Sequence, residues 1–190
     1  RVSNPGCYPT GFLALVRPLV RAGFVPLDYN FTVNAVSGYS GGGKAMIAEF
    51  EDAASTGFTA TAFRTYGLGL SHKHVPEMQK HARIEHPPIF QPAVARTYRG
   101  MIVEVPLPLH AFTRRPSLEA LENTLRDAYK DCPLIRVLPA EAATVAIEED
   151  HRVVGRPVEL AGCRRIEGRQ CQDQRDHRPD RGEGQPVRQH

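Results

Sequence analysis

Apolar residues recur at helical spacing in four stretches of this 190-residue chain, and short β-branched or aromatic runs lie between them. The pattern predicts helices at residues 9–23, 45–54, 75–84 and 118–129, and extended segments at residues 31–36, 63–70, 89–90, 101–105 and 134–138. Pro18 is expected to kink or interrupt the first helix, and Ser117 is a good N-cap for the last. Because strands and helices mix without strict alternation, we expect an α+β fold with a largely antiparallel sheet.

The hydrophobic pattern ends well before the chain does. All 14 Phe and Tyr residues lie at or before Tyr129, and from Glu167 onward only Cys171 and Val187 are hydrophobic. Burial of so little apolar surface cannot offset the entropy lost when a chain is ordered. We therefore expect one folded domain at residues 1–150 and a low-hydrophobicity, disordered tail at residues 151–190.

The net charge of +3 resides in that tail. Residues 151–190 carry nine Arg against six acidic residues, whereas residues 1–150 carry 15 basic and 15 acidic residues. Arg mixed with Asp and Glu gives no concentrated basic patch, so a nucleic-acid partner is not expected. No apolar run approaches the roughly 20 residues that a membrane span needs. The four cysteines show neither disulfide-framework nor zinc-ligand spacing, which indicates free thiols in the reducing cytoplasm.

The most informative single residue is Cys7, which follows the turn Asn4-Pro5-Gly6 and opens a predicted helix. The positive end of a helix dipole favours the thiolate, which is the nucleophilic form of cysteine. The sequence around Cys7 therefore fits a reactive thiol. A structural cysteine buried in a tight turn is the alternative.

A glycine-rich loop from Gly38 to Lys44 lies between a predicted strand and a predicted helix. It nearly matches the P-loop of nucleotide-binding proteins, but Ala45 stands where a Ser or Thr hydroxyl would bind Mg²⁺. A P-loop-like nucleotide-binding module is thus one hypothesis. A phosphate-ester or carboxylate site, built from backbone N–H groups and Lys44, is a second, and a flexible surface loop is a third.

Two histidines and a carboxylate gather in the segment His72-Lys73-His74-Val75-Pro76-Glu77. Histidine is the usual general acid/base near neutral pH, and a carboxylate can fix its tautomer. Metal binding is the competing interpretation, but no third ligand cluster is evident, so we expect no metal site. A cysteine nucleophile, a histidine base and an anion-binding loop together indicate acyl-transfer chemistry.

Three segments carry a resemblance to a known family: residues 4–10 around Cys7, the loop at residues 37–44, and residues 72–77. In order and spacing they resemble the signature blocks of N-acetyl-γ-glutamyl-phosphate reductase, and are most similar to the shorter of that enzyme's two forms. The resemblance covers about residues 1–150. It implies the catalytic and oligomerisation domain of a homo-oligomer, an α+β unit like that of glyceraldehyde-3-phosphate dehydrogenases.

The family's reaction implies roles for the motif residues. Cys7 would attack N-acetyl-γ-glutamyl phosphate to form a thioester, which NADPH reduces to N-acetylglutamate semialdehyde in arginine biosynthesis. His74 would be the acid/base, with His72 and Glu77 orienting it or the substrate, although the roles of the two histidines could be exchanged. The substrate's phosphate or carboxylate, or the cofactor, would contact Ser37, Gly38, Ser40 and Lys44. Arg64 is a carboxylate-clamp candidate on its chemistry alone.

Two features depart from the family. No G-x-G-x-x-G segment occurs in the chain, so NADP(H) is expected to bind mainly to a domain upstream of Arg1, and the chain alone is expected to be inactive. A catalytically dead remnant that acts only in oligomerisation is a further alternative. The tail lacks the family's glycine-rich ending, and we hypothesise that it is translated out of frame or comes from a degenerate gene copy.

Overall fold

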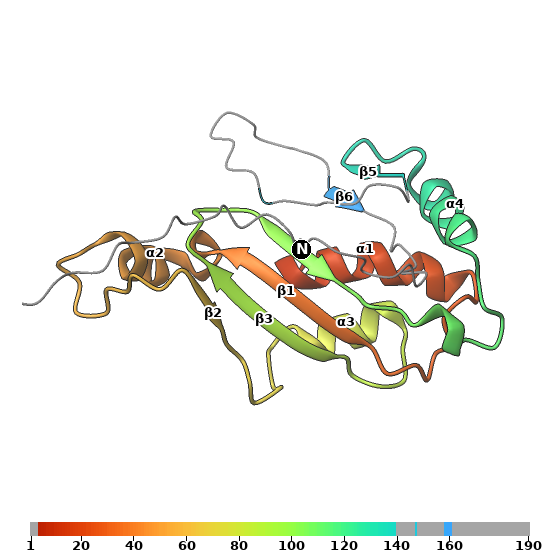
Figure 1. The fold of residues 1–190 in the computed structure, drawn as a ribbon, viewed down its shortest axis with the longest axis horizontal. Helices are drawn as coiled ribbons and strands as arrows, with labels where there is room; N and C mark the ends of the chain where they lie inside the picture. Colours follow the sequence, from red (N-terminus) through yellow and green to blue (C-terminus); the bar gives the residue numbers. More distant parts are fainter. Residues whose placement is uncertain (1–3, 140–146, 148–157, 161–190) are drawn as a thin grey trace, which may run out of the picture.

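A computed structural model describes residues 4–139, residue 147 and residues 158–160, and its main part is a four-stranded sheet with helices against one face (Figure 1). The elements follow in the order α1 (Cys7–Arg21), β1 (Thr32–Gly38), the 3₁₀ helix η1 (Tyr39–Gly42), α2 (Gly43–Glu51), β2 (Phe63–Thr65), α3 (Val75–Ala82), β3 (Ile89–Ala95), β4 (Met101–Glu104), η2 (Leu109–Ala111), α4 (Leu118–Tyr129), β5 (Ile135–Val137) and β6 (Val158–Leu160). The predicted α+β class is confirmed.

The strands of the main sheet are ordered β2-β3-β1-β4. The two outer pairs, β2–β3 and β1–β4, are antiparallel as expected. The central and longest pair is parallel, with Thr32 of β1 opposite Ile89 of β3. A parallel pair needs a long crossover, and here α2, β2 and α3 lie between the two strands in sequence. The sheet is therefore mixed.

The two faces of the sheet differ in burial. Along β1, Val33, Ala35 and Ser37 are buried, whereas the alternate residues Thr32, Asn34 and Val36 are partly exposed. On the buried face α1 and α3 pack against each other, and α4 packs on α1. Apolar side chains from helices and strands share one core there. We call the other side of the sheet the open face. The strand register places the exposed side chains of Phe63 and Ile89 on it.

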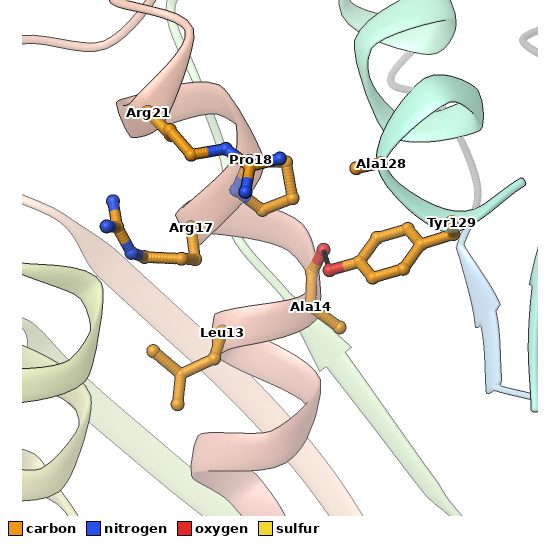
Figure 2. A pocket seen from close by; sticks show the side chains of 7 residues that line it. All are labelled: Leu13, Ala14, Arg17, Pro18, Arg21, Ala128 and Tyr129. Atoms are coloured by element: carbon orange, nitrogen blue, oxygen red, sulfur yellow. Dashed lines mark hydrogen bonds between the residues drawn. The ribbon is translucent and has the colours of Figure 1, made fainter. Parts of the chain in front are cut away.

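Helix α1 runs through Pro18 without interruption, although its sequence predicted a kink or a break. Proline has no N–H to donate to the carbonyl four residues earlier, which is that of Ala14. The Tyr129 hydroxyl of α4 donates to this carbonyl at 2.7 Å (Figure 2). A side chain from a distant helix thus satisfies the acceptor that Pro18 leaves open, which helps to explain why the helix continues.

Strand β3 also continues through a proline. The sequence predicted a strand only at residues 89–90, and proline is rare inside central strands. The buried Pro92 instead lies opposite Ala35 of β1, and its carbonyl accepts the N–H of Tyr66 at 3.0 Å. The predicted extended segment at residues 63–70 forms a strand only at β2, and the Tyr66 contact follows directly after it.

Residues 39–62, here called the arm, leave the end of β1 and include η1 and α2, which project beyond the sheet (Figure 1). The arm is held through Phe50, which is 2% exposed. The ring of Tyr39 stacks on it at 4.8 Å, and the guanidinium groups of Arg64 and Arg96 lie 5.7 and 5.9 Å from its centre. Arg96 also donates to the carbonyls of Phe50 and Thr59.

Strand β6 at residues 158–160 lies in the segment that the sequence assigned to the tail, and it pairs in parallel with β5. The other residues after 147, and with them most of the predicted tail, lie outside the described residues. None of the helices in the described ranges is long and apolar enough to cross a membrane.

Candidate active site

Cys7 is the first residue of α1, and its side chain is exposed. The helix starts after Gly6, whose backbone is extended, and no side chain caps it. Instead the carboxylate of Glu77, from the first turn of α3, accepts the Gly6 N–H at 2.9 Å. The start of one helix therefore holds the start of the other, and Cys7 lies at the junction.

Gly6 allows a close approach between these two helix starts. A Cβ atom at this position would lie 2.8 Å from His74 Nε2 and 2.8 Å from Glu77 Oε2. His74 therefore packs directly against the residue that precedes Cys7. The structure thus places His74 and Glu77 against the residue before Cys7, and it gives Gly6 a steric reason that the sequence alone did not reveal.

The two histidine rings lie edge to face, with their centres 4.7 Å apart. The backbone N–H of His74 donates to His72 Nδ1 at 3.2 Å, so this nitrogen must be unprotonated and any ring proton sits on Nε2. His74 Nδ1 is buried and has no hydrogen-bond partner among the described residues. Its Nε2 is the nitrogen that faces Gly6.

Burial lowers the pKa of both imidazoles. For His72 the neighbouring His74 and Lys73 lower the pKa further. For His74 burial outweighs the carboxylate of Glu77, which acts in the opposite direction. Both rings are therefore neutral at neutral pH, the form in which histidine accepts a proton.

Two tyrosines that the sequence did not single out complete the surroundings of Cys7. The hydroxyl of Tyr8 donates to Ser37 Oγ at 2.9 Å and lies 3.0 Å from the hydroxyl of Tyr66. Ser37, a predicted substrate contact, is 9% exposed and is engaged with Tyr8. Tyr8 is part of the first signature segment, which was a signal that could have revealed it. Tyr66 lies in no motif.

The glycine-rich loop does not present a row of free N–H groups. The N–H groups of Gly38, Tyr39 and Ser40 donate to the carbonyls of Gly100, Thr97 and Tyr98 at 2.9–3.0 Å. A P-loop binds phosphate through such groups, so the geometry gives the nucleotide-binding interpretation no support. Lys44 is exposed in the first turn of α2.

Arg64, the predicted carboxylate clamp, pairs with the carboxylate of Glu49 on α2. This hydrogen-bonded pairing raises the pKa of Arg64 and lowers the pKa of Glu49. Within the described contacts Arg64 thus connects β2 to the arm and does not join the cluster around Cys7.

Within the described ranges no three His, Cys, Asp or Glu side chains are grouped so as to hold a metal ion. A groove of about 300 Å³ lies between α1 and α4, lined in part by Arg17, Arg21 and Tyr129 (Figure 2). None of the predicted site residues lines it. The candidate site is therefore the exposed junction of α1 and α3, not this groove.

The chain matches the family model described as the semialdehyde dehydrogenase dimerisation domain over residues 7–158. It is 52% identical over 140 residues to the N-acetyl-γ-glutamyl-phosphate reductase of Brucella anthropi, and 51% identical over the same length to those of Brucella ovis and Brucella canis. Each match covers 74% of this chain and 45% of the relative. The chain thus spans less than half the length of these relatives.

The family match includes Cys7 and both histidines and covers all the described helices. The chain therefore belongs to the family of semialdehyde dehydrogenase dimerisation domains, and within it the chain is similar to N-acetyl-γ-glutamyl-phosphate reductases.

Proposed function

We propose that this chain carries the nucleophile and the acid/base of an enzyme that reduces N-acetyl-γ-glutamyl phosphate to N-acetylglutamate semialdehyde, with release of phosphate, in cytoplasmic arginine biosynthesis. The observation that carries the proposal is the junction of two helix starts. An exposed thiol opens α1, and a neutral imidazole nitrogen lies against the residue before it. Paired nucleophile and base are what acyl transfer needs.

The thiol performs the first half of this reaction without a cofactor. The Cys7 thiolate attacks the carbonyl carbon of the acyl phosphate, so that a C–S bond forms. The C–O bond to phosphate then breaks, and inorganic phosphate leaves with the bonding electron pair. The product is a thioester on Cys7, and no electron has been transferred. The positive end of α1 favours the attacking thiolate and the developing negative charge at this position.

We assign the acid/base role to His74 and an orienting role to His72. His74 Nε2 faces the start of α1, whereas His72 Nδ1 is occupied by the His74 backbone. As a neutral base His74 can take the Cys7 thiol proton, and as an acid it can return a proton to an oxygen at the same carbon. Glu77 positions the helix start, because its carboxylate holds the Gly6 N–H.

The reduction requires a hydride, which NADPH would supply in the proposed enzyme. The described residues do not fit a dinucleotide: the chain has no G-x-G-x-x-G segment, and three N–H groups of its glycine-rich loop are already engaged. The described residues therefore supply no cofactor site, and we expect no NADPH-dependent turnover from the 190-residue chain alone.

The open face of the sheet is the surface that we assign to self-association. Phe63 and Ile89 are 55% and 46% exposed on it, and apolar side chains of this size are commonly covered in an oligomer. The description of the matching family as a dimerisation domain supports this assignment. Sedimentation of F63K and I89K variants tests it: each should reduce the dimer fraction, and an unchanged dimer would contradict the assignment.

The acyl-transfer half can be tested on the chain as it is. The chain is mixed with N-acetyl-γ-glutamyl phosphate in the absence of NADPH, and phosphate release and the masses of its cysteine peptides are measured. We expect stoichiometric phosphate and one N-acetylglutamyl group on Cys7. Cys7→Ser should abolish both, and Cys132→Ser, which removes the other described thiol, should change neither. Equal acylation of Cys132, or none at Cys7, would refute the proposal.

The histidine assignment has its own test in the same assay. His74→Gln should slow acylation about 10²- to 10⁴-fold, the usual contribution of general acid–base catalysis. His72→Gln should slow it less, because His72 acts through the position of His74. The reverse order would exchange the two roles and leave the function of the site in place.

A further inference from the structure

Besides its contact with α3, the start of α1 is attached to the sheet. This attachment is a chain of three hydroxyl groups on Ser37, Tyr8 and Tyr66. Tyr8 is in the middle of this chain and follows Cys7 directly in α1. Its side chain is 3% exposed, so its hydroxyl cannot exchange these partners for water. Any constraint on Tyr8 is thereby transmitted to the residue beside it, the proposed nucleophile.

The Tyr8 hydroxyl is fixed from three parts of the sheet. Ser37 comes from β1, Tyr66 follows β2, and the Ala93 carbonyl of β3 lies 3.5 Å away. A phenol has a single proton to donate. If Tyr8 donates to Ser37, the proton between the two tyrosines must come from Tyr66. The three hydroxyl groups therefore form an ordered chain in which Tyr66 donates to Tyr8 and Tyr8 donates to Ser37.

Tyr66 is suited to that donor role. Its N–H is fixed to the Pro92 carbonyl, so the residue is attached to β3 as well as to Tyr8. Burial and the hydrogen bond with Tyr8 raise its pKa most, and the nearby Cys7 raises it further. The phenol therefore remains protonated beside an ionised Cys7, and it keeps its proton available to Tyr8.

The ring of Tyr8 connects this chain to both imidazoles. Its centre lies 6.1 Å from that of His72 and 5.9 Å from that of His74, and in both contacts the rings meet edge to face. The Tyr8 ring also contacts the ring of Phe90 of β3, and the two ring centres are 5.0 Å apart. From the first turn of α1, the same side chain thus contacts both the sheet and the histidine pair.

We propose that the hydroxyl chain Ser37–Tyr8–Tyr66 is a positioning device that fixes the first turn of α1, and with it Cys7, relative to His74. The proposal rests on the proposed function of Cys7 as the nucleophile. Helix α1 has no side-chain cap at its start, and among the described residues the Glu77 carboxylate and this chain attach it there. A loss of either lets the thiol shift against the imidazole, and shifts of about 1 Å can cost about 10²-fold in rate.

The experiment measures how fast iodoacetamide alkylates Cys7 in the folded chain at neutral pH, with Cys132 as the internal reference. Tyr8→Phe and Tyr66→Phe each remove one hydroxyl and keep the ring, and the double variant tests whether the two act as one unit. Each single change should lower the ratio of the Cys7 rate to the Cys132 rate about tenfold, within the range that small misplacements produce. The double variant should lower it no further.

Tyr129→Phe is the matched control. It also removes a tyrosine hydroxyl bonded within the fold, but this hydroxyl belongs to α4 and contacts Ala14. It should reduce thermal stability and leave the alkylation ratio unchanged. If Tyr8→Phe does not fold, Ser37→Ala and Tyr66→Phe decide the question from the two ends of the chain, and each should give the same loss.

The proposal is overturned if the folded Tyr66→Phe and Ser37→Ala variants keep the ratio within about twofold of that of the unaltered chain. Such a change is well short of the effect of a misplaced group. The proposed function fails differently. If Cys7 of the unaltered chain reacts no faster than Cys132, then Cys7 is not an activated nucleophile, and both proposals are refuted together.

Discussion

The first turn of α1 and the arm both contain a glycine motif, but the fold holds the two in different ways. At the first turn, a Cβ atom on Gly6 would lie 2.8 Å from atoms of both His74 and Glu77. In the arm, a Cβ atom on Gly41 or Gly43 would meet nothing within 4 Å. The first glycine is required by its neighbours, whereas Gly43 is suited to a backbone with a φ of +74°.

This contrast separates two kinds of functional segment. The Cys7 region is built into the main core, where small displacements are resisted by close-packed neighbours. The arm projects from the sheet and is anchored mainly around one buried ring, that of Phe50. The residues proposed to perform chemistry are thus held by close-packed neighbours. The loop proposed to contact substrate or cofactor belongs to the arm, which we expect to open without unfolding the rest.

The largest expected effect comes from truncating one buried phenylalanine in each region. Phe12 of α1 is fully buried, with its ring centre 5.7 Å from that of Phe31 in the main core. Phe12→Ala should lower the free energy of unfolding by about 3–5 kcal/mol, the usual cost of such a cavity. Phe50→Ala should instead open the arm, with new protease cleavage at residues 39–62 and a smaller shift of the urea midpoint.

Circular dichroism in urea measures the first effect, and limited proteolysis with mass spectrometry measures the second. Equal losses of global stability in the two variants would show that the arm and the core unfold as one unit. In that case the distinction between the two regions would not hold.

Glycine-to-alanine changes give the next effect in size. Gly6→Ala should destabilise the chain by about 1–3 kcal/mol, because the added methyl group must displace His74 or Glu77 from a packed site. It should also slow the alkylation of Cys7. Gly41→Ala is the matched control, because its methyl group enters open space. Thermal unfolding and iodoacetamide kinetics check both, and a Gly6→Ala variant as stable and reactive as the parent would contradict the packing.

The sequence predicted best the features that local signals determine. The cap at Ser117 is such a signal, and α4 begins at Leu118 with the Ser117 hydroxyl accepting the Ala120 N–H. Local patterns succeed where the determining contacts lie within a few residues.

The failures share one cause, which is long-range pairing. Nothing near Pro18 indicates that Tyr129 satisfies the Ala14 carbonyl, and nothing near Pro92 indicates a central strand. The pairing of Arg64 with Glu49, which is 15 residues away on another element, was likewise not predicted. Tyr66 was missed for the same reason: its importance comes from Tyr8, which is 58 residues away in sequence.

The bond between Tyr129 and Ala14 gives a smaller effect that tests the rigid region alone. Tyr129→Phe should cost about 1–2 kcal/mol, because it leaves the Ala14 carbonyl without a donor in a buried helix. In a Pro18→Ala background the restored N–H can serve that carbonyl, and the same change should cost clearly less. Urea denaturation of the four proteins gives this double-mutant cycle. An equal cost in both backgrounds would show that Pro18 is not the reason for the bond.

The smallest expected effect is a difference between the two regions in how their stability depends on pH. Burial lowers the pKa of His72 and His74 below the ordinary 6.5, so between the two values the unfolded chain binds more protons. The stability of the Cys7 region should therefore fall as pH drops below about 6.5. In the arm the pKa of Glu49 is lowered from 4.5 by Arg64, so that contribution persists to lower pH and is lost only as pH falls through the lowered value.

Urea denaturation between pH 8 and about pH 5, where the imidazoles titrate, measures the first change. Protease sensitivity of residues 39–62 over the same range follows the arm. The double variant His72→Gln, His74→Gln should flatten the pH dependence of global stability, since it removes the two groups whose protonation the fold opposes. Glu49→Gln should leave that dependence in place and expose the arm at every pH, because its ion pair is already lost. If the pH dependence of global stability survives the loss of both histidines, other groups couple protonation to unfolding. The burial of the two imidazoles would then not be its cause.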